Sequence, residues 1–320
     1  MNCIGVYTSG GDAPGMNAYV RAVVRTCIYH GIKVVGIRRG YEGMIESDFV
    51  EMDARSVSNI IQRGGTILKS SRSERFRTPE GRKKAFKNLK KAGIEGMVAI
   101  GGDGTFAGAR AFSSEHPIPI VGAPGTIDND LYGTDFTIGY DTALNTAMEG
   151  IDKIRDTADS HNRIFFVEVM GRDAGFLALN SGIAAAAEAV LIPEEETIIE
   201  DIIKKLEQGR KKDSNIIVVA EGDDAGGAFE VAKKVEENYD YQTRVVVLGH
   251  IQRGGSPSCF DRVLASRMGM AAVEALREGL SNVMIGMVND EIKYTSFDKA
   301  CKHEQQINKN LFDLLNILSV

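Results

Sequence analysis

The stretch that decides the fold spans residues 3–30 and reads CIGVYTSGGDAPGMNAYVRAVVRTCIYH. It begins with the apolar run Cys3–Tyr7, passes through the glycine-rich turn Thr8–Asn17, and ends in Met16–His30, where apolar side chains recur at helical spacing. A strand, a tight turn and a helix in this order are the first parts of a parallel β-α-β unit. The same order recurs along the chain, so we expect an α/β fold with doubly wound parallel sheets.

Further apolar runs predict strands that are buried on both faces, because they are continuous rather than alternating. They are Lys33–Ile37, Met97–Ile100, Ile118–Ala123, Ile164–Val169, Ala189–Ile192, Ile216–Ala220 and Val245–Leu248. Between them, Arg82–Ala92 and Thr142–Thr157 have the apolar spacing of helices. In Arg82–Ala92 we expect the apolar side chains inside and all the Lys and Arg side chains in solvent.

Composition limits the class of protein. The chain has 320 residues, which suggests two domains at about 150 residues each. With 43% hydrophobic residues it is a globular rather than a disordered sequence, and its net charge of -6 disfavours nucleic-acid binding. We find no signal-peptide pattern and no membrane span, so we expect a cytoplasmic protein without a membrane partner. The 4 cysteines form no C-x-x-C pair, so we expect them reduced, and the 5 histidines show no metal spacing.

Two glycine-rich turns follow predicted strands and indicate phosphate sites. In Thr8–Asn17, Gly10 and Gly11 allow close approach of the backbone, and the following helix offers free N–H groups. In Gly101–Thr105, the Asp103 carboxylate lies among glycines and can hold a divalent cation, while Thr105 can cap the next helix. A tight turn without a ligand remains the alternative for the first turn. The second pattern also occurs in kinases of NAD and of lipids, so it indicates a nucleotide phosphate.

A carboxylate-rich turn and a set of cations complete the pattern. Pro124–Asp130 places two carboxylates on either side of an Asn. One carboxylate could accept a proton, and the other could face a metal or orient its partner. The alternative is an Asx-rich turn without a catalytic role. Cationic side chains, which bind phosphate or form surface ion pairs, stand at strand ends: Arg163, Arg172, Arg244, His250 and Arg253. These features together predict phosphoryl transfer between a nucleotide and a phosphorylated small molecule.

These motifs, in this order, resemble the bacterial-type ATP-dependent 6-phosphofructokinases. The resemblance runs from Gly5 to about Gly269 and includes Arg63–Thr66, Val167–Arg172 and Leu248–Pro257 besides the turns above. It implies two α/β/α (Rossmann-like, doubly wound) domains with the active site in the cleft between them. The ATP-binding domain would comprise residues 1–139 plus about 252–305, and the sugar-phosphate domain about 140–251 plus 306–320.

The resemblance also implies the reaction and the residues that carry it. ATP would phosphorylate the 1-hydroxyl of fructose 6-phosphate in glycolysis, with Mg²⁺ held by Asp103. Gly11 would place its backbone on the ATP phosphates, in a nucleotide site completed by Tyr41, Arg72, Ser73, Gly102, Gly104 and Thr105. Asp128 would be the general base, Asp130 would support its loop, and Thr126 and Arg172 would stabilise the transferring group. The sugar phosphate would contact Met170, Gly171, Arg172, Glu221, His250 and Arg253.

Oligomeric state and regulation are implied in the same way. Arg163 and Arg244 match residues that reach the 6-phosphate from a neighbouring subunit, which implies a homotetramer, or at least a dimer, for activity. Residues matching an effector site for ADP and phosphoenolpyruvate are Arg21, Arg25, Arg155, Glu188 and Lys212. The family has Arg at position 54, where this chain has Ala54 followed by Arg55. A one-residue step turns a helical side chain by about 100°, so we expect a weakened effector site.

Three alternatives remain open from the sequence. Pyrophosphate-dependent relatives typically carry Asp in place of Gly104 and Lys in place of Gly125, so the two glycines favour ATP. A kinase of another sugar phosphate shares the same loops. A catalytically silent regulatory subunit would be expected to lack Asp103, Asp128 or Arg172, and all three are present.

Overall fold

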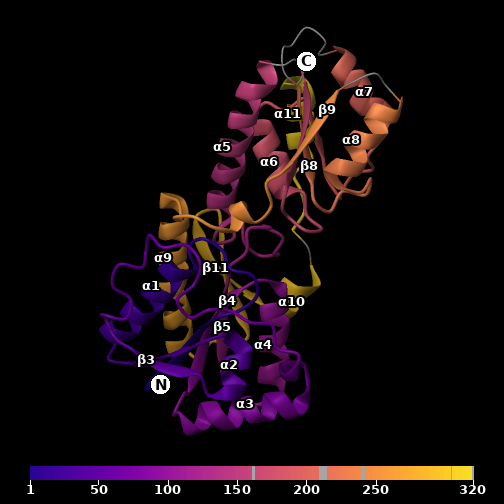
Figure 1. The fold of residues 1–320 in the computed structure, drawn as a ribbon. Coiled ribbons are helices and arrows are strands. Elements are labelled where there is room, and N and C mark those ends of the chain that lie inside the picture. Colours follow the sequence, from indigo (N-terminus) through magenta and orange to yellow (C-terminus); the bar gives the residue numbers. More distant parts are fainter. Residues whose placement is uncertain (161–162, 209–214, 239–241, 304, 319–320) are drawn as a thin grey trace. The chain divides into compact units, whose positions relative to one another are not determined.

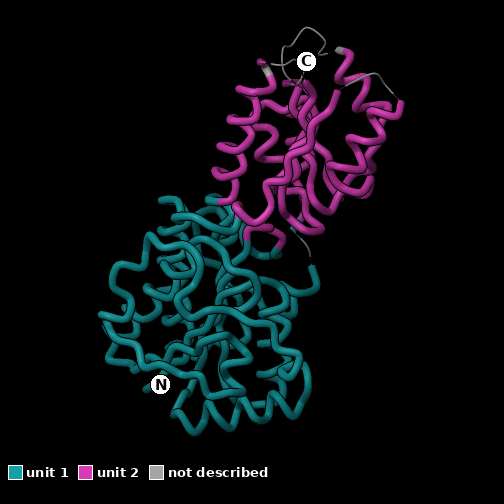
Figure 2. Tube along the Cα trace, viewed as in Figure 1, with its two compact units in different colours: residues 1–126, 131–142, 253–305 teal, residues 127–130, 143–252, 306–320 magenta. Residues whose placement is uncertain are grey.

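The computed structural model describes residues 1–160, 163–208, 215–238, 242–303 and 305–318, and the chain divides into two compact units (Figure 2). Unit 1 comprises residues 1–126, 131–142 and 253–305, and unit 2 comprises residues 127–130, 143–252 and 306–320. The expected division differs from this in two places. Residues 127–130 group with unit 2, where Asp128 lies within ion-pair distance of Arg172, and residues 140–142 group with unit 1.

Unit 1 is built on one mixed sheet (Figure 1). Its strands are β1 (Cys3–Thr8), β2 (Lys33–Ile37), β3 (Phe49–Met52), β4 (Gly96–Gly101), β5 (Ile120–Pro124), β10 (Val283–Val288) and β11 (Glu291–Ser296). They lie in the order β11-β10-β5-β4-β1-β2-β3. The inner strands are parallel, whereas β3 and β11 run antiparallel to β2 and β10. The sequence predicted β1, β2, β4 and β5, but not β3, β10 or β11.

Helices cover both faces of this sheet. On one face, α1 (Met16–Tyr29) packs against α9 (Cys259–Arg277), where Gly269 allows the Tyr19 carbonyl to come close. On the other face, buried side chains form a core with the strands, including Tyr7 of β1. The elements on this face are α2 (Gly40–Glu46), the 3-10 turn η1 (Arg75–Arg77), α3 (Pro79–Lys91), α4 (Asp103–Glu115) and α10 (Phe297–Lys302).

Unit 2 contains a parallel sheet with the strand order β7-β8-β6-β9. The strands are β6 (Ile164–Val169), β7 (Ala189–Leu191), β8 (Asn215–Ala220) and β9 (Thr243–Val247), each within about two residues of its predicted ends. One core packs α7 (Ile199–Gln208) and α8 (Gly227–Asn238) against the sheet. The unit also contains α6 (Phe176–Ala184), α11 (Asn310–Leu318), most of α5 (Tyr140–Asp159) and most of the 3-10 turn η2 (Gly249–Arg253). The predicted α/β class with parallel sheets and helices around them is therefore confirmed.

The basic helix α3 is only partly a solvated face. Lys83 is exposed, but Arg82 is buried, and its Nε donates to Glu115 at 2.7 Å. Its Nη1 donates to the carbonyls of Phe76 (3.0 Å) and Arg77 (2.7 Å). The expectation that every Lys and Arg of this helix lies in solvent is wrong for Arg82, because its guanidinium ties η1, α3 and α4 together.

Of the helices that the described residues form, none combines the length and the hydropathy required to cross a bilayer.

Candidate active site

The three turns that the sequence singles out follow neighbouring strands of unit 1. Because β5, β4 and β1 are adjacent and parallel, these turns leave the same carboxyl edge of the sheet. Backbone hydrogen bonds join them: Ser9 N–H donates to the Ile100 carbonyl, and Gly125 N–H to the Gly101 carbonyl, both at 3.0 Å. Ligands of α/β sheets bind at this edge.

The first turn requires glycine at defined positions. Gly10 and Gly15 have positive φ values of 82° and 107°. A Cβ on Gly11 would lie 2.1 Å from Nη1 of Arg253, so the guanidinium lies directly on the backbone of the loop. We expected Arg253 to contact the sugar phosphate; the structure places it in unit 1 beside the first turn.

The second turn presents one exposed carboxylate. Asp103 is the first residue of α4 and is exposed, and a Cβ on Gly102 or Gly104 would meet no atom within 4 Å. The N-cap of α4 is Gly102, which makes no side-chain cap, so the capping role expected for Thr105 is wrong. The Thr105 hydroxyl is buried and has no hydrogen-bond partner among the described residues. The loop therefore offers open backbone and an exposed carboxylate, with the Thr105 hydroxyl buried next to them in the sequence.

Asp103 fits a magnesium ion held largely by phosphate and water. Among the described residues, no group of three or more His, Cys, Asp and Glu side chains could hold a metal. Mg²⁺ commonly takes one or two protein carboxylates and completes its shell with substrate phosphates and water. A single exposed carboxylate at a phosphate loop matches that donor set.

The other nucleotide-site candidates differ in exposure. Tyr41 is buried, stacks on Phe76 with ring centroids 4.0 Å apart, and donates its hydroxyl to the Thr105 carbonyl at 2.5 Å. It therefore supports the first turn of α4 from below. Ser73 donates to Glu42 at 2.6 Å, whereas Arg72 is exposed.

The third turn carries a buried carboxylate next to a guanidinium. The Asp128 residue is 3% exposed, and its Oδ2 lies 3.6 Å from Nε of Arg172. Asn129 and Arg172 both have left-handed backbones, with φ values of 54° and 53°. Such conformations cost of order 1–3 kcal/mol for residues other than glycine, and they cluster at functional sites. At the start of the turn, the Thr126 carbonyl accepts a hydrogen bond from Thr137 Oγ1 at 2.6 Å.

Two loops at the carboxyl edge of the unit 2 sheet hold Arg172. Glu221, which follows β8, accepts hydrogen bonds from the N–H groups of Arg172 (2.8 Å) and Gly171 (3.3 Å). A Cβ on Gly222 would lie 1.9 Å from the Arg172 carbonyl oxygen, so only glycine fits there. The buried Gln252 accepts from Met170 N–H at 3.4 Å. This edge also carries exposed His250, after β9.

Arg163 and Arg244 lie at the opposite edge of the same sheet. Arg163 directly precedes β6, and Arg244 is the second residue of β9, paired with Phe165. Arg172 follows the other end of β6, and six residues of strand span about 20 Å at 3.3 Å per residue. The chain thus brings Arg172, Glu221 and His250 to one edge and leaves Arg163 and Arg244 at the other.

Three of the expected effector residues form hydrogen bonds with backbone groups of the unit to which they belong. Arg25 donates to the Ala54 carbonyl at 3.3 Å. Arg155 donates to the Ala186 carbonyl at 3.1 Å, beyond the end of α6. Glu188 is buried and accepts from Ile216 N–H at 2.7 Å. Arg21 is partly exposed and Arg55 is exposed, while Lys212 lies outside the described residues.

Sequence reasoning missed Gly222 and Gln252 as site residues. Gln252 stands between His250 and Arg253, and Gly222 directly follows Glu221 at the end of a predicted strand. A glycine after a strand in a doubly wound sheet is the signal that could have found the second loop.

Known proteins match this chain over its length. The family model of phosphofructokinase matches residues 3–276. The chain is 54% identical to "ATP-dependent 6-phosphofructokinase 2" of Bacteroides thetaiotaomicron, covering 100% of this chain and 99% of the relative. It is 56% identical to "ATP-dependent 6-phosphofructokinase 1" of Thermus thermophilus, covering 100% of both chains.

A solved structure agrees with these sequence matches. Phosphofructokinase from Saccharomyces cerevisiae aligns with a TM-score of 0.91 and 36% identity, over 100% of this chain and 48% of that one, so this chain spans about half of the yeast chain. With the family model covering most of its length, the chain belongs to the phosphofructokinase family.

Proposed function

We propose that this protein transfers the γ-phosphoryl group of Mg-ATP to the 1-hydroxyl of fructose 6-phosphate, giving fructose 1,6-bisphosphate and ADP, the committed step of glycolysis. The observation that carries the proposal is the buried Asp128 carboxylate 3.6 Å from the Arg172 guanidinium, in a chain of the phosphofructokinase family. A proton acceptor beside a fixed cation is what transfer to a hydroxyl needs.

Asp128 acts as the general base. It takes the proton of the 1-hydroxyl while that oxygen bonds to the γ-phosphorus, and the bond from phosphorus to the β,γ-bridging oxygen breaks, so that ADP leaves with the electron pair. Arg172, Thr126 and the backbone of Gly11 stabilise the charge on the transferring group. Asp130 supports the loop of the base.

The nucleotide contacts the turns of unit 1. The open backbone of Gly102 and Gly104 suits phosphate oxygens, and the buried Thr105 hydroxyl lies next to it in the sequence. Tyr41, Arg72 and Ser73 line the remainder of this site. Asp103 would hold Mg²⁺, which supplies charge neutralisation on the phosphates when bound.

Two glycines support ATP as the donor. The space around Gly104 is open, whereas a Cβ on Gly125 would lie 2.5 Å from Cγ1 of buried Ile100. A lysine at position 125 would therefore force the core beneath it to repack. A coupled assay with ATP and then with pyrophosphate tests the donor, and turnover with pyrophosphate alone would refute the assignment.

The sugar phosphate contacts the carboxyl edge of the unit 2 sheet, through Met170, Gly171, Arg172, Glu221 and His250, with Arg253 as a further ligand. Arg163 and Arg244 lie about 20 Å from this edge, by the length of β6. This distance supports a role for them at the site of another copy of the chain rather than at the site of their own. We therefore infer a homo-oligomer, the homotetramer of the family, with shared sites.

Regulation follows from the effector-site residues. ADP and phosphoenolpyruvate would bind through Arg21, Arg25, Arg155, Glu188 and Lys212. Position 54 contributes only a carbonyl, which Arg25 contacts. We therefore expect the coupling free energy between effector binding and fructose 6-phosphate binding to be at or below the usual 1–3 kcal/mol. Saturation curves for fructose 6-phosphate with and without each effector measure this coupling. Strong sigmoidicity that ADP abolishes would contradict a weakened site.

The base is tested by Asp128→Asn, which keeps the shape of the side chain but cannot take the proton. We expect kcat to fall by at least about 10²–10⁴-fold with little change in the KM for ATP. Arg163→Ala is a control that should act on the KM for the sugar phosphate instead. A kcat near that of the wild type in Asp128→Asn would remove Asp128 from its role.

A further inference from the structure

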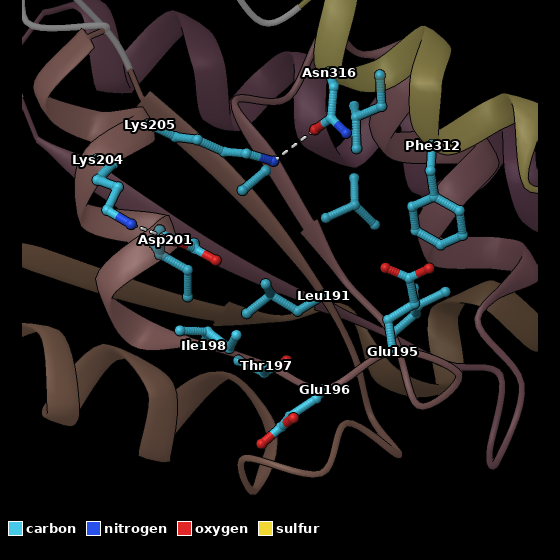
Figure 3. A pocket seen from close by; sticks show the side chains of 15 residues that line it. Leu191, Glu195, Glu196, Thr197, Ile198, Asp201, Lys204, Lys205, Phe312 and Asn316 are labelled. Atoms are coloured by element: carbon cyan, nitrogen blue, oxygen red, sulfur yellow. Dashed lines mark hydrogen bonds and ion pairs between the residues drawn. The ribbon is translucent and has the colours of Figure 1, made fainter.

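Unit 2 contains a cavity that none of the roles above uses (Figure 3). It has a volume of about 390 Å³ and lies beside β7, between α7 and α11. Its apolar walls include Leu191, Ile198, Ile202, Phe312 and Leu315. A space of this size and lining accommodates a small organic molecule.

Lys205 gives one side of the cavity a positive charge. Its Nζ donates to Oδ1 of Asn316, a neutral oxygen, at 2.9 Å. The adjacent Lys204 is instead paired with the carboxylate of Asp201 at 2.8 Å, and both of those side chains are more than half exposed. Burial lowers the pKa of Lys205, because a half-buried ammonium loses hydration. A bound anion would restore the lost stabilisation with a charge-assisted hydrogen bond.

Carboxylates also line the cavity. Asp201, on the same helix, pairs with Lys204 and partly offsets the effect of burial on the pKa of Lys205. Figure 3 shows the carboxylate of Glu195 beside Phe312, away from Nζ of Lys205. The apolar walls lie between the two ends, so a ligand with one anionic end and an apolar body matches the Lys205 side and the walls. Glu195 is exposed and stays hydrated, so a cation gains little there, whereas an anion at the half-buried Lys205 gains more.

Residues 193–198, several of which line the cavity, also form hydrogen bonds with loops near Arg172. Both carboxylate oxygens of Glu194 accept from Gly175 N–H, at 2.9 and 3.1 Å. Thr197 donates its hydroxyl to Asp223 at 2.8 Å. Gly175 follows Arg172 in the loop after β6, and Asp223 lies two residues after Glu221, which accepts from Arg172 N–H. Residues 194–197 are therefore bonded to both segments that place the Arg172 backbone.

We propose that this cavity is a regulatory site for a small carboxylate with an apolar body, which pairs with Lys205 and changes the placement of Arg172. The regulatory part rests on the role proposed for Arg172, whereas binding does not. Of the effector residues that the structure describes, none lines the cavity.

The test uses hexanoate as the probe, with hexylammonium and hexanol as matched molecules of other charge. Binding is read from methyl NMR signals of Ile198 and Ile202 in the full-length protein without substrates. We expect hexanoate to shift these signals at millimolar concentration, hexylammonium to leave them in place, and Lys205→Met to weaken binding at least tenfold. Lys204→Met is the control and should bind as the wild type does.

A second readout tests regulation. Saturating hexanoate should change the KM for fructose 6-phosphate in the wild type but not in Lys205→Met, whose melting temperature confirms folding. The Asp128→Asn variant should bind hexanoate normally, so a wrong catalytic assignment is distinguishable from a wrong cavity assignment. Absence of binding, equal binding of hexylammonium, unchanged affinity in Lys205→Met, or binding without a kinetic effect would each overturn the proposal.

Discussion

Gly222→Ala tests whether the backbone of Arg172 limits the reaction. The added Cβ would lie 1.9 Å from the Arg172 carbonyl oxygen and 3.3 Å from the ring of Pro193, which blocks retreat. Ordinary contact begins at 3.4 Å, so the two loops must separate by about 1.5 Å. Gly222 has no positive φ, so alanine suits its backbone and the effect is steric. A displacement of about 1 Å at a reacting group can cost 10²-fold, so we expect kcat to fall by at least about 10²-fold.

Steady-state kinetics with varied ATP and varied fructose 6-phosphate provide the assay. The KM for ATP should stay unchanged, because the nucleotide residues belong to unit 1. Gly150→Ala is the matched control: its Cβ meets only the flexible end of Leu248 at 3.1 Å, and alanine favours the helix by up to about 1 kcal/mol. A folded Gly222→Ala enzyme with the kcat of the wild type would refute the reasoning.

Three further variants address the remaining structure. Arg244→Ala should raise the KM for the sugar phosphate about 10- to 150-fold, as loss of a charged hydrogen bond of 1.5–3 kcal/mol predicts, and an unchanged KM would exclude a shared phosphate site. Arg82→Met leaves the carbonyls of Phe76 and Arg77 without their donor and should cost about 1–3 kcal/mol in the free energy of unfolding by urea, whereas exposed Lys83→Met should cost almost nothing. Burial raises the pKa of Asp261 to about 6, so its proton is bound more tightly in the folded than in the unfolded protein. This carboxyl therefore destabilises the fold above about pH 6, the penalty disappears toward pH 4, and Asp261→Asn should flatten that dependence in melting curves measured from pH 7 to 5.

The sequence predicted the elements that have strong local signals. Continuous apolar runs mark β1, β4 and β6, and the glycines after them mark the turns of the site. The antiparallel strands β3 and β11 carry partly exposed side chains at the sheet edges, so their pattern is weak. The sequence of β10 is apolar throughout, so its residues do carry a strand signal.

Contacts between distant residues could not be predicted from local pattern. Arg82 looks like its lysine neighbours until its partner Glu115, on another helix, is known. The guanidinium of Arg253 contacts the backbone of Gly11, although the two residues are far apart in the sequence. In both cases the fold, rather than the neighbouring sequence, decides which groups the guanidinium contacts.

The left-handed backbone of Arg172 makes this position a site of local strain. With φ of 53°, the position suits glycine, and replacing arginine there would relieve about 1–2 kcal/mol of local strain. Glycine there would also take the guanidinium away from the buried Asp128 carboxylate. Selection for thermal stability alone, without demand for turnover, should therefore favour replacement of both residues together. Relief of local strain and activity are opposed at this residue. Consensus or stability-guided redesign of the chain should leave position 172 untouched.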